Sequence, residues 1–170
     1  MTFYRSLDDL PAFTDYAMTN RTYRYHTGEV LYPFGHGLSY TSFGYSNPRA
    51  AANDDGSVAV SVDVANTGGM DGDEVVQLYL SRPDLPDQPI RALAAFDRVH
   101  LARGETRTVS FTLDDRALST VDDQGTRAVR PGKVEMWVGG GQPVARTGLA
   151  AAPGAPVSVT LVGPVRTLPK

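Results

Sequence analysis

Several residue types and segments are missing or scarce in this chain of 170 residues, and each absence narrows its function. The sequence has no cysteine, which excludes a disulfide frame, a thiolate metal site and a cysteine nucleophile. Basic residues are scattered and the formal net charge is -3, so we expect no nucleic-acid partner. No hydrophobic run approaches the length of a membrane span, and residues 1–10 lack a leader pattern, so we expect no membrane partner.

Aromatic residues are unevenly distributed along the sequence. They make up 9% of the chain, yet those that lie beyond residue 45 are only Tyr79, Phe96, Phe111 and Trp137. The N-terminal part is crowded with rings and interrupted by Pro11 and Pro33, which argues against a long helix. We expect residues 1–45 to form an irregular, extended arm that lies against another surface, because alone in water it would expose too much apolar area.

From Ser57 onward, apolar and polar residues alternate with the two-residue period of half-buried strands. Residues 58–64 place four valines on one face, and residues 106–113 and 133–139 alternate in the same way. The further segments that we predict as strands are residues 75–81, 90–101 with an irregularity near Ala94 and Ala95, 126–129 and 157–163. Because turn signals and proline-rich loops such as residues 82–89 separate them, we predict an all-β antiparallel sandwich of about seven strands.

Acidic residues occur in doublets beside turn or cap signals. The four doublets are Asp8/Asp9, Asp54/Asp55, Asp114/Asp115 and Asp122/Asp123. We expect them to cap helical turns or stabilise loops rather than to form a catalytic pair. The loop after Asn66, with Asp71, Asp73 and Glu74, lacks the alternating oxygen ligands of a calcium site, so we expect no metal and no cofactor.

Histidine and serine residues do not form a recognisable catalytic pattern. The histidines are His26, His36 and His100, and none has a second ligand at metal-binding spacing, which favours hydrogen-bonded structural roles. Ser39 and Ser42 lie near one of them but not in the Gly-x-Ser-x-Gly turn that exposes a nucleophilic serine. The sequence therefore predicts no catalytic residue in this chain.

The aromatic residues have two interpretations. Tyrosine and tryptophan faces stack on sugar rings, so Tyr23, Tyr25 and Trp137 are candidates for binding an oligosaccharide. Rings that attach an arm to a neighbouring domain are the commoner use of so much apolar area. The residues by themselves leave both interpretations open.

Residues 23–46, YRYHTGEVLYPFGHGLSYTSFGYS, carry the most specific pattern in the chain. They resemble the C-terminal part of glycoside hydrolase family 3, the β-glucosidase and β-xylosidase family. In that family a Tyr-Pro-Phe-Gly-x-Gly-Leu-Ser-Tyr-Thr-x-Phe segment leads into a fibronectin type III-like domain, and residues 32–43 match it throughout. The similarity continues at residues 64–80, 93–106 and 130–140, and the opening residues look more like the xylosidase-type branch.

The resemblance implies a fold and a set of packing residues. It places a fibronectin type III or immunoglobulin-like β-sandwich over residues 46–170, after the arm of residues 1–45. The matched segment would form the joint with the preceding domain of the enzyme. The residues that it implies for interdomain packing are Tyr32, Pro33, Phe34, Gly35, Gly37, Tyr40 and Phe43.

The resemblance also implies what this chain does not contain. The catalytic aspartate and the acid/base carboxylate of the family belong to domains that are N-terminal to the matched region. Retaining hydrolysis needs both groups about 5 Å apart across one glycosidic bond. We therefore expect the chain alone not to be an enzyme, although its parent would hydrolyse terminal β-linked glucose or xylose from oligosaccharides.

Two functions from different classes follow from these observations. The first is a non-catalytic C-terminal accessory module that packs on the upstream catalytic domains and stabilises them, or that self-associates through the arm. The alternative is a carbohydrate-binding module that uses exposed aromatic residues on an oligosaccharide. Nothing in the sequence supports a third function as an independent small enzyme. The resemblance implies a periplasmic or secreted parent.

Overall fold

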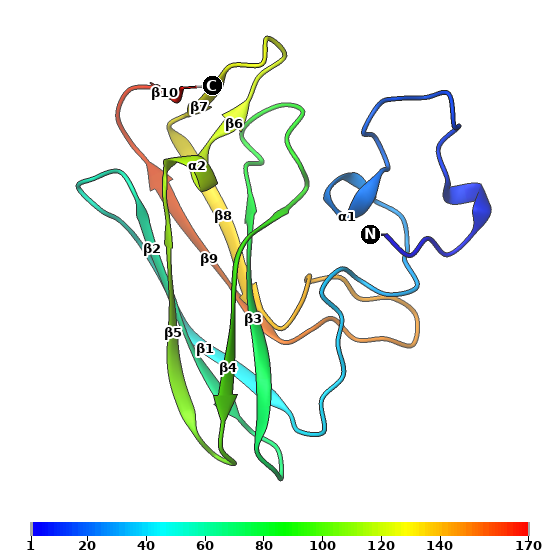
Figure 1. Cartoon of the computed structure of the whole chain (residues 1–170), viewed down its shortest axis with the longest axis vertical. Helices are drawn as coiled ribbons and strands as arrows, with labels where there is room; N and C mark the ends of the chain where they lie inside the picture. The colour runs from blue at the N-terminus through cyan, green and yellow to red at the C-terminus, as the bar shows by residue number, and fades with distance from the viewer. Residues whose placement is uncertain (1, 170) are drawn as a thin grey trace.

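The computed structural model describes residues 2–169, and two antiparallel β-sheets packed face to face make up most of it (Figure 1). One sheet, in the order β1-β2-β5, consists of β1 (Phe43–Ala52), β2 (Val58–Asn66) and β5 (Thr106–Leu113). The other, in the order β4-β3-β8-β9, consists of β3 (Gly72–Ser81), β4 (Ala92–Leu101), β8 (Gly132–Gly139) and β9 (Gly154–Leu161). The prediction of an all-β antiparallel sandwich is confirmed.

Short elements lie at one end of the sandwich and along the arm. A small sheet in the order β10-β7-β6 consists of β6 (Thr120–Val121), β7 (Arg127–Val129) and β10 (Arg166–Thr167). The helices are single turns, namely η1 (Leu7–Asp9), α1 (Thr22–Tyr25) and α2 (Asp115–Leu118). In residues 2–169, no helix is long and apolar enough to cross a lipid bilayer.

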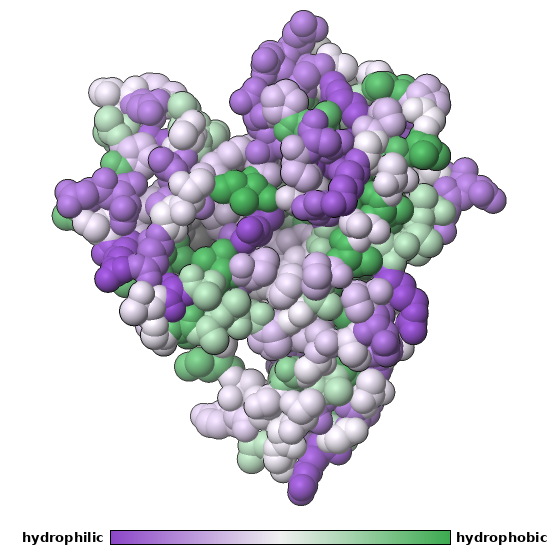
Figure 2. Space-filling model, turned by 180° about the vertical axis from the view of Figure 1, so that it is seen from behind, coloured by the Kyte–Doolittle hydropathy of each residue, from purple (hydrophilic) through white to green (hydrophobic). Residues whose placement is uncertain are grey.

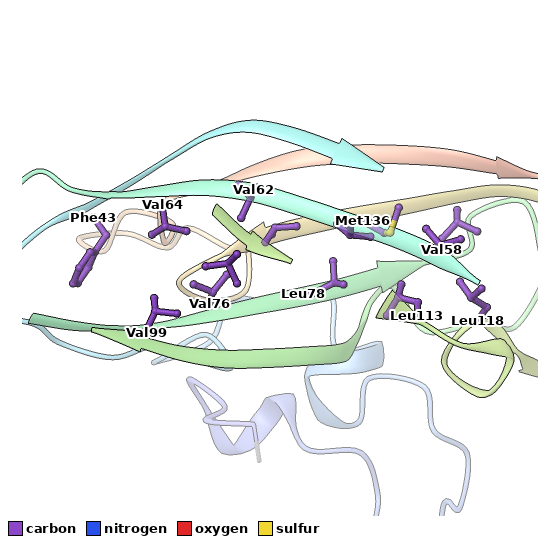
Figure 3. Close-up of a cluster of buried hydrophobic side chains, with 14 of the residues drawn as sticks. Phe43, Val58, Val62, Val64, Val76, Leu78, Val99, Leu113, Leu118 and Met136 are labelled. Carbon is purple, nitrogen blue, oxygen red and sulfur yellow. The ribbon is translucent and has the colours of Figure 1, made fainter. Parts of the chain in front are cut away.

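The core consists of the alternating apolar residues of facing strands. Val58, Val62 and Val64 on β2, and Val76 and Leu78 on β3, are 0% exposed. Figure 3 shows these side chains between the two sheets, where those of β2 point toward those of β3. A strand places alternate side chains on opposite faces, so each apolar series shares one face, as the sequence predicts. Each such burial contributes about 1.5–3 kcal/mol to folding.

β1 is a strand that the sequence analysis did not predict. Its alternation is interrupted at Asn47 and Pro48, where the register with β2 shifts between Ser46 and Arg49. Asn47 has φ 49°, and Pro48 has no amide N–H to donate, but β1 tolerates both at a bulge because it lies at the edge of its sheet. β1 begins at Phe43, before the expected sandwich start at residue 46, and the division of the chain there remains a prediction.

The connection between β3 and β4 agrees with the sequence. The register of the two strands shifts where Leu78 pairs with Ala95 and Tyr79 pairs with Leu93, which confirms the predicted irregularity near Ala94. The proline-rich residues 82–89 lie outside the strands.

Two other boundaries differ from the prediction. Residues 126–129 were expected among the sandwich strands, but they contribute only β7 of the small sheet. The strand predicted at residues 157–163 begins and ends earlier, since β9 spans Gly154–Leu161 and Pro156 already pairs with Trp137. β9 accepts this proline because one of its sides has no neighbouring strand.

The acidic doublets occupy caps and turns, as predicted. Ser6 and Asp9 form a capping box at η1, and Asp114 caps α2. Asp55 and Asp122 accept backbone N–H groups within their own turns. These carboxylates therefore stabilise local structure.

Candidate functional site

The outer face of the four-stranded sheet is where the arm meets the sandwich (Figure 1). Alternation along β3 turns Gln77 and Tyr79 away from the core, yet they are only 7% and 1% exposed. The Tyr79 hydroxyl donates to Gln77 Oε1 at 2.6 Å and reaches the carbonyl of Phe34 at 3.3 Å. Burial raises the pKa of Tyr79, so its hydroxyl remains a neutral donor at neutral pH. From Val76 to Tyr79, β3 is therefore covered on both faces, by the core and by the arm.

Stacked rings attach the arm to this face. The rings of Tyr23 and Phe34 are nearly parallel, with centroids 3.9 Å apart and an interplanar angle of 10°. Both meet the ring of Tyr79 edge-on, at 6.3 and 6.5 Å between centroids. The N–H of Leu93 donates to the Tyr23 hydroxyl at 3.0 Å. Helix α1 and the turn after Pro33 are thus anchored on the sheet by one aromatic cluster.

Gln142 holds the arm from the loop between β8 and β9. Its backbone N–H donates to the carbonyl of Phe34 at 3.1 Å, and its side-chain Oε1 accepts from the Phe34 N–H at 3.3 Å. Its Nε2 donates to the carbonyl of Tyr23 at 3.3 Å. Because Gln142 is buried, these bonds are made away from water. One glutamine therefore fixes both stacked residues of the arm.

The two predicted packing glycines differ in their surroundings. Gly35 has φ +79°, and a Cβ there would lie 2.1 Å from Gln77 Oε1 and 2.8 Å from the Tyr79 hydroxyl. A Cβ at Gly37 would meet nothing within 4 Å. Of these two glycines, Gly35 is the one required by close approach and by backbone conformation.

The remaining predicted packing residues divide into covered and exposed ones. Pro33 and Phe43 are buried and Phe34 is half-buried. Tyr32 is half-exposed, whereas Tyr40 is 98% exposed. The segment 32–43 is therefore partly attached to the sandwich and partly open to solvent.

Polar contacts fix the chain on the far side of this open turn. The Thr41 hydroxyl donates to Asn66 Oδ1 at 2.7 Å, and the buried Asn66 donates in turn to the carbonyls of Met70 and Leu101. The N–H of Thr67 donates to the carbonyl of Ser42 at 2.8 Å. Residues 37–40 thus form a turn that is held at both ends.

A hydrogen-bonded pair lies beside this turn. The Tyr45 hydroxyl donates to Glu74 Oε1 at 2.6 Å. Burial raises the pKa of both groups, so Tyr45 stays protonated and ionised Glu74 is less favourable than in water.

Large apolar side chains are exposed along the arm. They are Leu7, Phe13, Tyr16, Leu38 and Tyr40. Seen from behind, hydrophobic residues lie between the arm and the sandwich and also on the upper right of the sandwich (Figure 2). We call these five exposed side chains the arm surface.

The three sugar-binding candidates occupy different environments. Tyr23 is part of the aromatic cluster, and Tyr25 is half-buried with the Arg24 guanidinium 5.9 Å from its ring centroid. Trp137 is half-buried and lines a groove on the outer face of the sheet. Among the three, Trp137 is the one placed in a groove large enough for a ligand.

The histidines lie apart, as their spacing suggests. His100 Nδ1 is 2.6 Å from Asp73 Oδ1, and this bond, together with the Arg98 guanidinium, lowers the pKa of Asp73. His36 stacks on Tyr32. Across residues 2–169, no group of three or more histidine, aspartate or glutamate side chains is placed to hold a metal ion.

His26 departs from the prediction of a hydrogen-bonded role. Both of its ring nitrogens are buried and have no hydrogen-bond partner within the described part of the chain. Its ring instead meets that of Tyr4 edge-on, with centroids 4.9 Å apart. The prediction is wrong here because aromatic packing of the arm positions the imidazole.

The chain is similar to one part of several known enzymes. The sequence model of the fibronectin type III-like domain family matches residues 74–142. The chain is 38% identical over 141 residues to a xylan 1,4-beta-xylosidase of Xylanibacter ruminicola, covering 82% of this chain and 16% of that enzyme. It is 34% identical over 155 residues to a periplasmic beta-glucosidase of Salmonella typhimurium, covering 82% of this chain and 20% of that enzyme.

The solved structures that the chain resembles are also those of beta-glucosidases. Beta-glucosidase 3B of Thermotoga neapolitana matches with a TM-score of 0.71 and 30% identity, over 82% of this chain and 18% of that one. The GH3 beta-glucosidase of Bifidobacterium adolescentis matches with a TM-score of 0.71 and 29% identity, over 82% of this chain and 20% of that one. The chain contains the fibronectin type III-like domain of family 3 glycoside hydrolases.

This identification confirms the resemblance found in residues 23–46 and the fold that it implies. The fibronectin type III-like chain spans only 16% to 20% of the length of these enzymes. The part that it matches is a non-catalytic accessory domain, as the missing catalytic motifs predict.

Three polar residues that attach the arm to this fibronectin type III-like domain were not predicted from the sequence, namely Gln77, Tyr79 and Gln142. Gln77 and Tyr79 had a detectable signal, because residues 75–80 are apolar at nearly every position and so predict a strand covered on both faces. Gln142 had none, since it lies in a loop and acts through a tertiary contact. No role was predicted for the outer face of the strand expected at residues 75–81.

Proposed function

We propose that this fibronectin type III-like domain packs on the catalytic domains of a family 3 β-glycosidase and stabilises them. The relatives contain the matched region as a small part of a much longer chain, which supports a partner within the same enzyme. We further propose that this enzyme hydrolyses terminal β-linked glucose or xylose from oligosaccharides. The relatives named as a beta-glucosidase and as a xylan 1,4-beta-xylosidase support that substrate class.

The observation that carries this proposal is the exposure of Leu38 and Tyr40, at 96% and 98%. Both residues belong to the segment 32–43, whose neighbouring side chains Phe34 and Phe43 pack on the sandwich. Full burial of a large apolar side chain contributes about 1.5–3 kcal/mol. Two such side chains on one turn are therefore a strong anchor for a partner surface.

The turn that carries Leu38 and Tyr40 is pre-ordered for docking. On one side the N–H of His36 donates to the carbonyl of Pro33 at 3.1 Å, and on the other side Thr41 bonds to Asn66. A segment that is ordered before binding loses less conformational entropy when it docks. This favours a binding role for the turn over that of a flexible linker.

The test uses a chimera with the Xylanibacter ruminicola xylosidase. In the chimera, the region of the xylosidase that matches this chain is exchanged for this chain. The same xylosidase, truncated just before that region, serves as the baseline. We expect the chimera to retain activity at higher temperature than the truncated enzyme. The double change Leu38→Ser and Tyr40→Ser lowers the chimera's melting temperature by several degrees because the anchor is lost.

The matched control is Val162→Ser, at an exposed apolar residue that directly follows β9. This variant should melt like the unmodified chimera. Equal melting of the chimera and the truncated enzyme, or equal loss in the Leu38/Tyr40 and Val162 variants, contradicts the proposal. Light scattering on the chain alone adds one outcome: a dimer that the Leu38/Tyr40 double variant dissociates would assign the arm surface to a second copy instead.

A further inference from the structure

A groove of about 400 Å³ lies on the outer face of the four-stranded sheet. Two rows of side chains line its floor because the register pairs β3, β8 and β9 residue by residue. The first row is largely apolar and consists of Tyr79, Trp137 and Pro156. The second row is polar and consists of Ser81, Glu135 and Ser158. The groove therefore offers an apolar strip beside a strip of hydroxyl and carboxylate oxygens.

Trp137 is held firmly in this groove. Its Nε1–H donates to the carbonyl of Gly141 at 3.1 Å. Its six-membered ring lies against Gly154, where a Cβ would come within 2.6 Å of Cε2 and Cζ2. The indole is positioned before any ligand arrives, which lowers the entropic cost of binding.

Arg91 supplies unused donors at the same groove. Its guanidinium is half-buried, and it forms no hydrogen bond or ion pair with another residue in the described part of the chain. Burial lowers the pKa of Arg91, while its guanidinium nitrogens still reach solvent. Lys133, in contrast, is paired with Glu135 at 2.6 Å. A ligand that brings oxygen acceptors would therefore satisfy Arg91.

We propose that this groove binds a pyranose ring of a β-linked oligosaccharide. A pyranose has apolar C–H faces and a rim of hydroxyls, so it fits an aromatic platform beside polar groups. Its C–H face stacks on Trp137, while its hydroxyls accept from Arg91 and donate to Glu135. The groove also holds Lys133 paired with Glu135, so its charge does not separate a sugar from an acidic peptide, and the aromatic platform of Trp137 is what favours the sugar. The groove size is within the range of small-molecule sites.

This inference is independent of docking, because neither Leu38 nor Tyr40 lines the groove. It uses the proposed glycosidase function only to choose the sugars. Xylotetraose and cellotetraose are titrated separately into the full chain. Trp137 is the single tryptophan of the sequence, so its fluorescence reports on this groove alone. We expect a saturable change with a dissociation constant in the millimolar range for at least one sugar.

Arg91→Gln removes the unpaired donors and should weaken binding about tenfold, the effect of losing hydrogen bonds to a charged group. Trp137→Phe keeps an apolar ring of smaller area and should weaken binding as well, read by calorimetry. Arg49→Gln is the matched control, since this exposed arginine lies on β1 in the other sheet. It should bind like the unmodified chain, and so should the Leu38/Tyr40 double variant.

Three results would overturn the inference. The first is no fluorescence change and no heat with either tetrasaccharide. The second is equal binding by the Arg91→Gln and Arg49→Gln variants, which would place the sugar elsewhere. The third is saturable binding of a tetraglutamate peptide with no binding of either sugar, which would assign Arg91 to an acidic protein partner. Because the chimera measures docking without any of these ligands, failure here leaves the docking result interpretable.

Discussion

Large apolar side chains have opposite environments in two regions of the molecule. One region is the core between the two sheets, and the other is the arm surface. Between the sheets, Val62 and Leu78 are fully buried on facing strands (Figure 3). On the arm, Phe13 and Tyr16 are 94% and 90% exposed. The sandwich covers its own apolar residues, whereas the arm leaves apolar area for another surface to cover.

The boundary between these two regions runs through the segment 32–43. Phe34 packs with Tyr23 and Tyr79, and Phe43 joins the core, while Tyr40 lies open between them. One short motif therefore anchors the arm to the sandwich and presents a turn outward. This arrangement explains why a segment so rich in rings is neither a strand nor a flexible linker.

The largest expected difference between the two regions is in global stability. Leu78→Ala should reduce the free energy of unfolding by about 2–5 kcal/mol, because it removes buried contacts and leaves a cavity. Leu38→Ala should change it by less than about 0.5 kcal/mol, since that side chain touches little in this chain. Urea unfolding followed by circular dichroism measures both free energies. Comparable losses in the two variants would contradict the difference between the core and the arm surface.

The attachment of the arm should depend on the aromatic cluster. Phe34→Ala removes the ring stacked on Tyr23 and should cost the arm about 2 kcal/mol of local stability. Hydrogen exchange should then accelerate at the Gln142 N–H, which donates to the carbonyl of residue 34, while β2 amides keep their rates. Phe13→Ala is the control and should leave the exchange rates at Gln142 and in β2 unchanged. Unaltered exchange at Gln142 would mean that the stack does not hold the arm.

The two glycines of the motif should respond differently to the same change. Gly35→Ala should cost at least about 1 kcal/mol, because its φ is +79° and the new Cβ would overlap Gln77 Oε1. Gly37→Ala should have almost no effect on the isolated chain, since nothing lies within 4 Å of the added atom. Thermal melting compares them, and similar melting temperatures for the two variants would argue against the described path of the arm.

The smallest expected effect is electrostatic and belongs to Asp73 at the N-terminal end of β3. His100 and Arg98 lower the pKa of Asp73, so its ionised form contributes stability at pH values above the ordinary aspartate value of 3.8. That contribution is lost as the pH falls through the lowered pKa. Asp73→Asn should therefore melt slightly lower than the unmodified chain at pH 7, with the gap closing under strong acidification. A gap that persists unchanged at low pH would contradict this assignment.

The sequence predicted those features that depend on local alternation. Val58 to Val64 and Val109 to Leu113 repeat with a period of two, and their burial follows directly from the geometry of a strand. β1 was missed because Asn47 and Pro48 break that period at a bulge. The sandwich itself was thus predictable, and its least regular strand was not.

The candidate site was predictable only in part. The motif at residues 32–43 drew attention to Phe34 and Gly35, which do contact the sheet. Gln142 and Arg91 come from loops, and their importance depends on which distant residues surround them. No periodicity or spacing encodes such tertiary contacts. For the same reason, the sequence could not separate the exposed Tyr40 from the covered Phe43.

The most direct test of the docking claim is hydrogen exchange at residues 37–42 in the isolated chain and in the chimera with the catalytic domains. The claim predicts fast exchange at these amides in the isolated chain and marked protection in the chimera, while amides of β3 and β8 exchange equally in both. Equal, fast exchange at residues 37–42 in both proteins would show that the turn bearing Leu38 and Tyr40 is not an interface.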